Sequence, residues 1–187
     1  MKPLIGVVSW ALLTAAAAAQ APQGGPKPSP ELKRQSYYLG TWKCEGTTQA
    51  SASGPGSTST STSHSAWGLG GFFLVERGEF SDGGMNGKDV SYIGYDPQKK
   101  VYTFDSFNSM GESVHATGTV SGKTWTWKSP SNTGDKPGRV IITEDSPTSY
   151  SFKFESSADD GKTWTRKFED RCTKQSSVAA AAKKRAK

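Results

Sequence analysis

The chain is poor in the residues that most often carry catalysis or bind metals. Its 187 residues include two cysteines, Cys44 and Cys172, and two histidines, His64 and His115. Neither histidine belongs to an HxH or HExxH pattern that would present two ligands to one metal ion. There is no CxxC pair, no GxSxG elbow and no glycine-rich turn that leads into a helix. We therefore predict no catalytic residues, no metal site and a protein that is not an enzyme.

Long apolar runs are also scarce, and the main one lies at the start of the chain. Lys2 precedes an apolar run over residues 4–13, which small residues extend to Ala19. This order is typical of a secretory signal peptide, with Ala17 and Ala19 at the positions that signal peptidase requires. The run is shorter than the roughly 20 apolar residues that span a bilayer. We predict a signal peptide at residues 1–19, no integral membrane insertion after its cleavage, and a periplasmic or secreted protein.

Positive charge is concentrated at the ends of the chain, which argues against nucleic-acid binding. The net charge is +6, and removing Lys2 with the signal peptide leaves +5. Removing the four basic residues of the C-terminal tail as well leaves +1, so the predicted folded region is nearly neutral. No DNA- or RNA-binding motif accompanies the tail, and we expect no nucleic-acid partner. The tail, residues 176–187, is predicted to be disordered, with weak contact to an anionic surface as its alternative role.

One domain accounts for the rest of the mature chain. Residues 20–35 form a Pro- and Gly-rich linker and the start of a short helix. Ser29 offers an N-cap and Pro30 suits the first position of a helix over residues 31–38, which would plug one end of a barrel. Residues 36–175 are the right size for one domain with one core.

Short aromatic and β-branched segments with two-residue alternation fill this domain. Such alternation is typical of antiparallel strands with one buried face. Residues 57–63 alternate serine with threonine, so either face of this strand would bring small hydroxyl groups into the interior. The strands that we predict cover residues 42–45, 58–67, 72–80, 90–95, 101–107, 113–120, 124–128, 139–144, 150–155 and 164–172.

Turns rich in Asp, Gly and Pro separate these strands, and their shortness decides the topology. Examples lie at residues 82–84 and 96–97, and residues 68–71 predict a tight bend at a barrel corner. Residues 157–164 fit the Asp-box pattern S-x-D-x-G-x-x-W, which is a turn motif. Connections this short join neighbouring antiparallel strands, whereas a sandwich needs longer crossovers. We therefore predict an all-β fold, a closed antiparallel up-and-down β-barrel of about ten strands.

The two cysteines lie in the first and the last predicted strand. Proteins in oxidising compartments usually pair their cysteines. We predict a disulfide between Cys44 and Cys172 that holds the two edges of the sheet together; two unpaired buried cysteines are the alternative. Closing a loop of this length stabilises a fold by roughly 4–5 kcal/mol in the chain-entropy model.

The interior of such a barrel is the predicted functional region. About ten strands enclose more space than their side chains readily fill, so we expect a cavity that binds a small, mostly apolar ligand. If Arg166 faces the cavity, it would anchor an acidic group of that ligand; if it is buried instead, it would need a partner such as Glu76, Glu144 or Asp170. Core packing is the alternative role of each aromatic residue. The predicted ligand-binding residues are Trp42, Trp67, Trp125, Trp127, Phe152, Phe154, Trp164 and Arg166.

Four short segments carry a family resemblance. They are residues 39–46 (LGTWKCEG), 67–74 (WGLGGFFL), 93–97 (IGYDP) and 160–164 (DGKTW). Together they resemble the domain-of-unknown-function 1579 family of exported bacterial calycin-like proteins. The resemblance implies a lipocalin-like barrel and supplies no activity and no functional residues.

A second resemblance concerns a cofactor. Residues 40–46 are similar, except at Cys44, to the GxWxGxG opening of nitrobindin-like haem barrels, which implies a haem acting on nitric oxide or peroxynitrite. Residues 163–172 lack the histidine that those barrels place near their end, so a haem would need His64, His115 or a tyrosine. We expect no cofactor, with haem as one alternative. The other alternative for the function is a non-catalytic envelope structural or stress protein with a filled interior.

Overall fold

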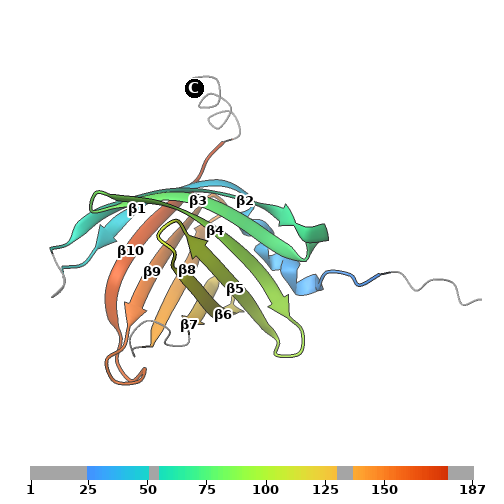
Figure 1. Ribbon diagram of the computed structural model, residues 1–187. Helices are drawn as coiled ribbons and strands as arrows, with labels where there is room; N and C mark the ends of the chain where they lie inside the picture. Colours follow the sequence, from blue (N-terminus) through green and yellow to red (C-terminus); the bar gives the residue numbers. More distant parts are fainter. Residues whose placement is uncertain (1–24, 51–54, 130–136, 177–187) are drawn as a thin grey trace, which may run out of the picture.

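Hairpin follows hairpin along the chain and closes into a barrel (Figure 1). The computed structural model describes residues 25–50, 55–129 and 137–176. Ten antiparallel strands are arranged in the order β1-β10-β9-β8-β7-β6-β5-β4-β3-β2, which confirms the predicted up-and-down barrel. The strands are β1 Gly40–Thr48, β2 Ser57–Gly68, β3 Phe73–Asp82, β4 Met85–Asp96, β5 Val101–Asn108, β6 Ser113–Ser121, β7 Thr124–Ser129, β8 Gly138–Ser146, β9 Ser149–Ser156 and β10 Thr165–Lys174.

Two segments singled out from the sequence lie outside the described residues. These are the predicted signal peptide, residues 1–19, and the basic tail from residue 177 onward. Within the part of the chain that is described, no helix has the length and apolar character needed to cross a membrane.

Strand β2 shows how two-residue alternation sorts side chains between the two faces of the sheet. Its serines turn inward, with Ser59 and Ser65 buried, whereas Thr58 and Thr60 are exposed. Successive side chains of a strand point to opposite faces, so five serines line one side of the interior. The barrel therefore has one wall of small hydroxyl groups.

A disulfide joins the two ends of the sheet. Cys44 of β1 lies directly opposite Cys172 of β10, with 3.9 Å between the Cα atoms, and the two sulfurs are bonded. This confirms the predicted pairing. Both cysteines are buried against Trp42 and Tyr150, and the Tyr150 hydroxyl lies 3.7 Å from the Cys44 sulfur.

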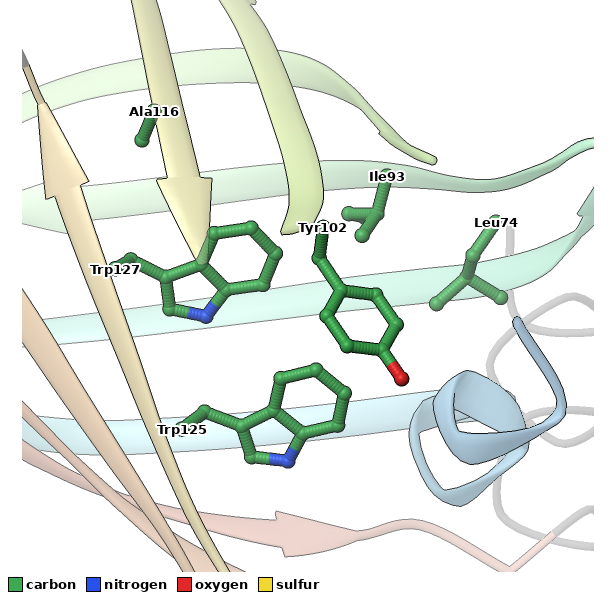
Figure 2. Close-up of a cluster of buried hydrophobic side chains, with 6 residues drawn as sticks. All are labelled: Leu74, Ile93, Tyr102, Ala116, Trp125 and Trp127. Atoms are coloured by element: carbon green, nitrogen blue, oxygen red, sulfur yellow. The ribbon is translucent and has the colours of Figure 1, made fainter. Parts of the chain in front are cut away.

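Aromatic rings fill much of the interior on the side of β4 to β7. Trp125 and Trp127 of β7 are stacked, with 6.0 Å between ring centroids, and Tyr102 meets Trp125 edge-on (Figure 2). Gly118 of β6 makes room for one of them, because a Cβ atom there would lie 2.5 Å from the Trp127 ring. The rest of this buried cluster consists of Leu74, Ile93 and Ala116.

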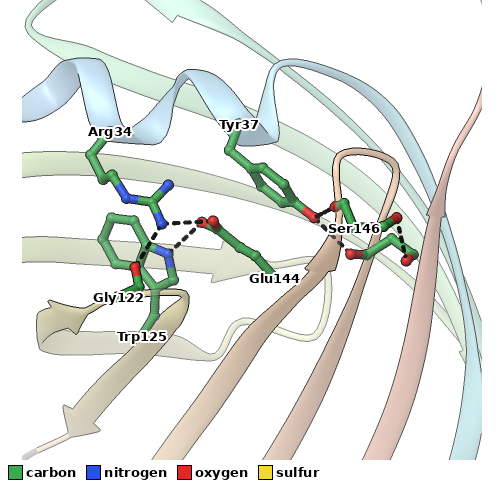
Figure 3. Close-up of polar contacts among 7 residues, drawn as sticks. Arg34, Tyr37, Gly122, Trp125, Glu144 and Ser146 are labelled. Carbon is green, nitrogen blue, oxygen red and sulfur yellow. Dashed lines mark hydrogen bonds and ion pairs between the residues drawn. The ribbon is translucent and has the colours of Figure 1, made fainter.

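A short 3-10 helix, η1 (Pro30–Tyr38), closes one end of the barrel, as the sequence predicted. Arg34 of η1 forms an ion pair with Glu144 of β8 at 2.6 Å and donates to the carbonyl of Gly122 at 3.1 Å (Figure 3). The other carboxylate oxygen of Glu144 accepts from the Trp125 indole N–H at 2.8 Å. One buried carboxylate thus ties η1 to the tryptophan core.

Further hydrogen bonds fix η1 around the rim. The Tyr37 hydroxyl lies 2.7 Å from the carbonyl oxygens of both Ser146 and Ser149, in the β8–β9 turn (Figure 3). The Trp42 indole donates to the Tyr38 carbonyl at 2.8 Å. At the same rim, the predicted bend is a second 3-10 turn, η2 (Leu69–Gly71), in which Gly70 and Gly71 adopt positive φ.

Removing the disulfide is expected to destabilise the barrel. The Cys44→Ala/Cys172→Ala variant should lose about 3–5 kcal/mol of unfolding free energy, because its unfolded chain is no longer cross-linked. Urea denaturation measures the loss, and wild-type protein under reducing conditions should lose a similar amount. Equal stability of the oxidised and reduced proteins would contradict this expectation.

Removing the η1 ion pair should also lower stability. Arg34→Met leaves the buried Glu144 carboxylate without its cation, and we expect a loss of about 2 kcal/mol, since the Arg34 side chain is 34% exposed. Thermal or urea unfolding measures this loss. Adding Glu144→Gln removes the unpaired charge, so the double variant should be more stable than Arg34→Met alone; the reverse order would contradict the assignment.

Candidate ligand-binding cavity

A cavity of about 260 Å³ lies inside the barrel. It extends from Gln35 and Tyr38 of η1 to Ser129 and Gly138, which lie at the opposite end of β7 and β8. This volume is slightly below the usual range for small-molecule sites, about 300–1,000 Å³, so a ligand would be small. Most of the wall is apolar and includes Leu74, Ile93, Phe104, Ala116, Ile142 and Phe152.

The structure divides the predicted inward-facing aromatic residues between the cavity and the core. Trp127, Phe152 and Phe154 line the cavity. Trp42 and Trp125 are fully buried and lie among the described core residues instead, packed against Tyr side chains of η1. The position of η1 separates the two groups, because it covers the end of the barrel where Trp42 and Trp125 lie.

Three predicted site residues lie away from the cavity. Trp67 is exposed at the end of β2, and Trp164 precedes β10 and packs against the Arg139 guanidinium, 4.1 Å from its ring centroid. Arg166 is exposed and pairs with Glu169 on the outer surface. The predicted inward orientation of Arg166 is wrong because the pairing of β10 with β9 shifts by one residue between Arg166 and Phe168. A one-residue shift exchanges the two faces of a strand.

The Asp-box segment before β10 is a hydrogen-bonded turn, as its pattern predicted. Ser157 Oγ accepts from the Gly161 N–H at 2.7 Å, and Asp159 accepts from the backbone and hydroxyl of Thr163 at 2.8 and 2.7 Å. These hydrogen bonds lower the pKa of Asp159 to about 2. The turn positions Trp164 beside the barrel and carries no group into the cavity.

Glu76 of β3 is the acidic residue among the described residues of the cavity wall, and the sequence suggested it only as a partner for a buried Arg166. Glu76 shares its face with Leu74, and its Oε2 accepts from Ser65 Oγ at 2.8 Å and from Ser63 Oγ at 3.2 Å. Burial raises the pKa of Glu76, and the nearby Asp89 raises it further, whereas the two serine hydrogen bonds lower it. The sequence contained one signal for this position. Glu76 follows Leu74 by two residues, and residues at this spacing in a strand share a face, so an inward leucine implies an inward glutamate.

Another acid, which is buried, accepts a hydrogen bond from a different serine of β2. Asp170 of β10 accepts from Ser59 Oγ at 3.0 Å. Burial raises the pKa of Asp170 to about 6, and the charge of Asp82 adds to the effect. Gly46 leaves the space that this carboxyl group occupies, because a Cβ atom there would lie 1.6 Å from Asp170 Oδ1. The serines of β2 therefore donate to carboxylates of β3, the neighbouring strand on one side, and of β10, which lies beyond β1 on the other side.

Two polar atoms of η1 are buried without a hydrogen bond among the described residues. They are Gln35 Nε2 and the Tyr38 hydroxyl, and both residues line the cavity. Gln35 is only 2% exposed. Buried polar groups in native proteins nearly always have a partner, so this end of the cavity has the character of a polar binding site.

The residues present do not fit a haem. His64 is exposed and lies 3.1 Å from Thr41 Oγ1, and His115 contacts Asp105 at 2.7 Å on the outer surface, so neither histidine faces the cavity. Burial raises the pKa of Tyr38, which disfavours the phenolate that would bind iron. No group of three or more metal-binding side chains occurs in the described parts of the chain.

Fold and cavity together define the class of protein, a calycin-like β-barrel. A family model described as "Protein of unknown function (DUF1579)" matches residues 27–173. The chain belongs to this family, as its sequence motifs indicated. No curated protein matches the chain.

Two solved structures share the fold. "Crystal Structure of Rv2717c from M. tuberculosis" is 12% identical, with a TM-score of 0.56, over 80% of this chain and 100% of that one. "Structure of S-type Phycobiliprotein Lyase CPES from Guillardia theta" is 9% identical, with a TM-score of 0.52, over 78% of this chain and 92% of that one. At these identities the likeness concerns the fold alone.

Asp170 is expected to make stability depend on pH. Its pKa is about 6 in the folded protein against an ordinary 3.8. The folded state therefore binds more protons between these values, and stability falls as the pH rises through this range. Asp170→Asn should raise the free energy of unfolding by on the order of 2 kcal/mol at neutral pH, and by little below about pH 4. Urea denaturation at both pH values tests this, and an equal gain at both would contradict it.

Proposed function

We propose that this protein is exported and binds a small, mostly apolar molecule inside its barrel, without catalysing a reaction on it. The observation that carries the proposal is the cavity of about 260 Å³, whose wall is mostly apolar and which η1 closes at one end. An apolar cavity with a few convergent polar groups is the usual form of a small-molecule site.

The end opposite η1 supplies the entrance. Phe154 and Val114 both line the cavity, and they are 36% and 48% exposed. Side chains that contact both the cavity and solvent mark where a ligand enters, and exposed apolar groups at that position favour the entry of an apolar molecule.

Two features support export. The disulfide between Cys44 and Cys172 is of the kind that persists in oxidising compartments such as the periplasm or the extracellular medium. The apolar run over residues 4–13, with the small residues after it, has the order of a secretory signal peptide.

The chemistry of the wall supports binding without catalysis. Among the described residues, the cavity contains the carboxyl group of Glu76 but neither a histidine nor a free thiol. A nucleophile with an adjacent base, the usual arrangement for covalent catalysis, is not among the described lining residues. The lyase from Guillardia theta shares the fold, and its activity is a property of that protein.

Filling the cavity should prevent binding. Ala116 is buried and lines the cavity, so Ala116→Leu adds three carbon atoms to the space that a ligand would occupy. Native mass spectrometry of the exported, folded protein should show the mass of a bound molecule for the wild type, and little of it for Ala116→Leu.

The control is Ala66→Leu, at an exposed position of β2, which should retain the bound mass. A wild-type protein with no added mass, or an added mass that Ala116→Leu leaves unchanged, would contradict the proposed function. Thermal unfolding of each variant shows that the barrel remains folded.

A further inference from the structure

The interior of the barrel holds acidic groups that form no ion pair, because Arg139, the cation among the described residues of the cavity wall, is paired with Glu155 at 2.6 Å. Glu76, Asp89 and Asp170 all have pKa values raised by burial. None of the three takes part in the ion pairs found among residues 25–50, 55–129 and 137–176. A buried carboxylate without a cation is unfavourable, so a positively charged ligand would lower the free energy of this interior.

Glu76 is the acid that faces the cavity, and its hydrogen bonds leave one oxygen for a ligand. Ser63 and Ser65 both donate to Oε2. Within the described chain, Oε1 accepts no hydrogen bond from another residue. The two serines fix the position of the carboxyl group and point Oε1 to a different partner.

Two further acceptors lie in the same cavity wall. The Tyr38 hydroxyl can accept as well as donate, and it is buried without a partner among the described residues. On Gln35 the amide nitrogen, Nε2, has no partner among the described residues. An amide presents its oxygen or its nitrogen according to the partner it meets, so half a turn of the Gln35 amide would offer its oxygen to a ligand that donates. With Glu76 Oε1, these groups supply three acceptors, the number that the three N–H bonds of a primary ammonium group require.

The aromatic part of the wall also suits a cation. Tyr38, Tyr150, Phe104 and Trp127 line the cavity together with Glu76. The faces of aromatic rings attract cations, more strongly where water is excluded. Burial raises the pKa of Tyr150, and the charge of Glu76 raises it further.

Building on the proposed function, we infer that the ligand is a primary amine whose ammonium group binds Glu76, Gln35 and Tyr38, while its apolar part extends along the cavity toward Phe154. Gln35 and Tyr38 belong to η1, and Glu76 lies opposite Ser65, which in turn lies opposite Gly40 just after η1. The polar groups therefore lie at the η1 end of the cavity, and the apolar entrance lies at the other. The site thus prefers a positively charged group on the ligand, whereas an inward Arg166 would have preferred a negatively charged one.

Three naphthalene derivatives of nearly equal shape test this inference. They are 2-naphthylmethylamine, which is a cation at neutral pH, 2-naphthylmethanol, which is neutral, and 2-naphthoate, which is an anion. Isothermal titration calorimetry with the full-length mature protein should show that the amine binds about tenfold or more tightly than the alcohol, since a charge-assisted hydrogen bond replaces a neutral one. The naphthoate should bind most weakly.

Glu76→Gln should remove the preference for the amine and leave the affinity for the alcohol within about threefold of wild type. The matched control is Glu79→Gln on the same strand, because Glu79 is exposed and pairs with Lys88 at 3.1 Å on the outer surface. This control should keep the full preference. Tyr38→Phe, which removes one acceptor and no ring atoms, should weaken amine binding several-fold and provides a second test if Glu76→Gln fails to fold.

The outcomes separate this inference from the proposed function. If the alcohol binds and Ala116→Leu prevents this, but the amine has no advantage or naphthoate binds best, the proposed function stands and the amine inference is overturned. An amine preference that survives Glu76→Gln in a folded protein also overturns it. If none of the three compounds binds but the exported protein carries a mass that Ala116→Leu removes, the amine inference is overturned and the proposed function stands. If there is no bound mass either, both fail.

Discussion

The pairing of β1 with β10 is the constraint on which the rest of the structure depends. These strands are far apart in sequence, and they form a ladder from Trp42 opposite Lys174 to Thr48 opposite Phe168, with the disulfide within it. Closure removes both free edges of the sheet, so the barrel has no exposed strand edge among its ten strands. It also encloses the interior, and this enclosure both excludes water from the aromatic cluster and makes carboxylates such as Glu76 and Asp170 costly to ionise.

An interior that contains buried acids is less stable than one filled with apolar side chains, and the chain provides compensation at several points. The inward serines of β2 donate to Glu76 and Asp170, and Gly46 leaves the space that the latter needs. Natural proteins retain such unfavourable groups mainly where function requires them. The described residues combine an apolar wall, unpaired acids and unpartnered polar atoms on Gln35 and Tyr38, which is easier to explain in a binding site than in a core that only stabilises the fold.

Local patterns in the sequence were sufficient for the fold and insufficient for the site. Two-residue alternation and short turns identify strands and their order, and the positions of Cys44 and Cys172 at the two ends of that order give the disulfide. The orientation of Arg166 depends on a single register shift that no local pattern marks. Whether an inward tryptophan lines the cavity, as Trp127 does, or is covered, as Trp42 is, depends on where η1 packs. The polar end of the cavity combines side chains of β2, β3 and η1, which only the closed barrel brings together.

The location of Cys172 in the last strand has a consequence for how a complete molecule can be recognised. A chain that ends before β10 lacks the partner of Cys44, so its thiol remains free and reactive, whereas the complete chain has no free thiol. The disulfide can form only after β10 has been synthesised and has paired with β1. Truncated products therefore carry a free thiol, by which a thiol-specific reagent distinguishes them from the finished barrel.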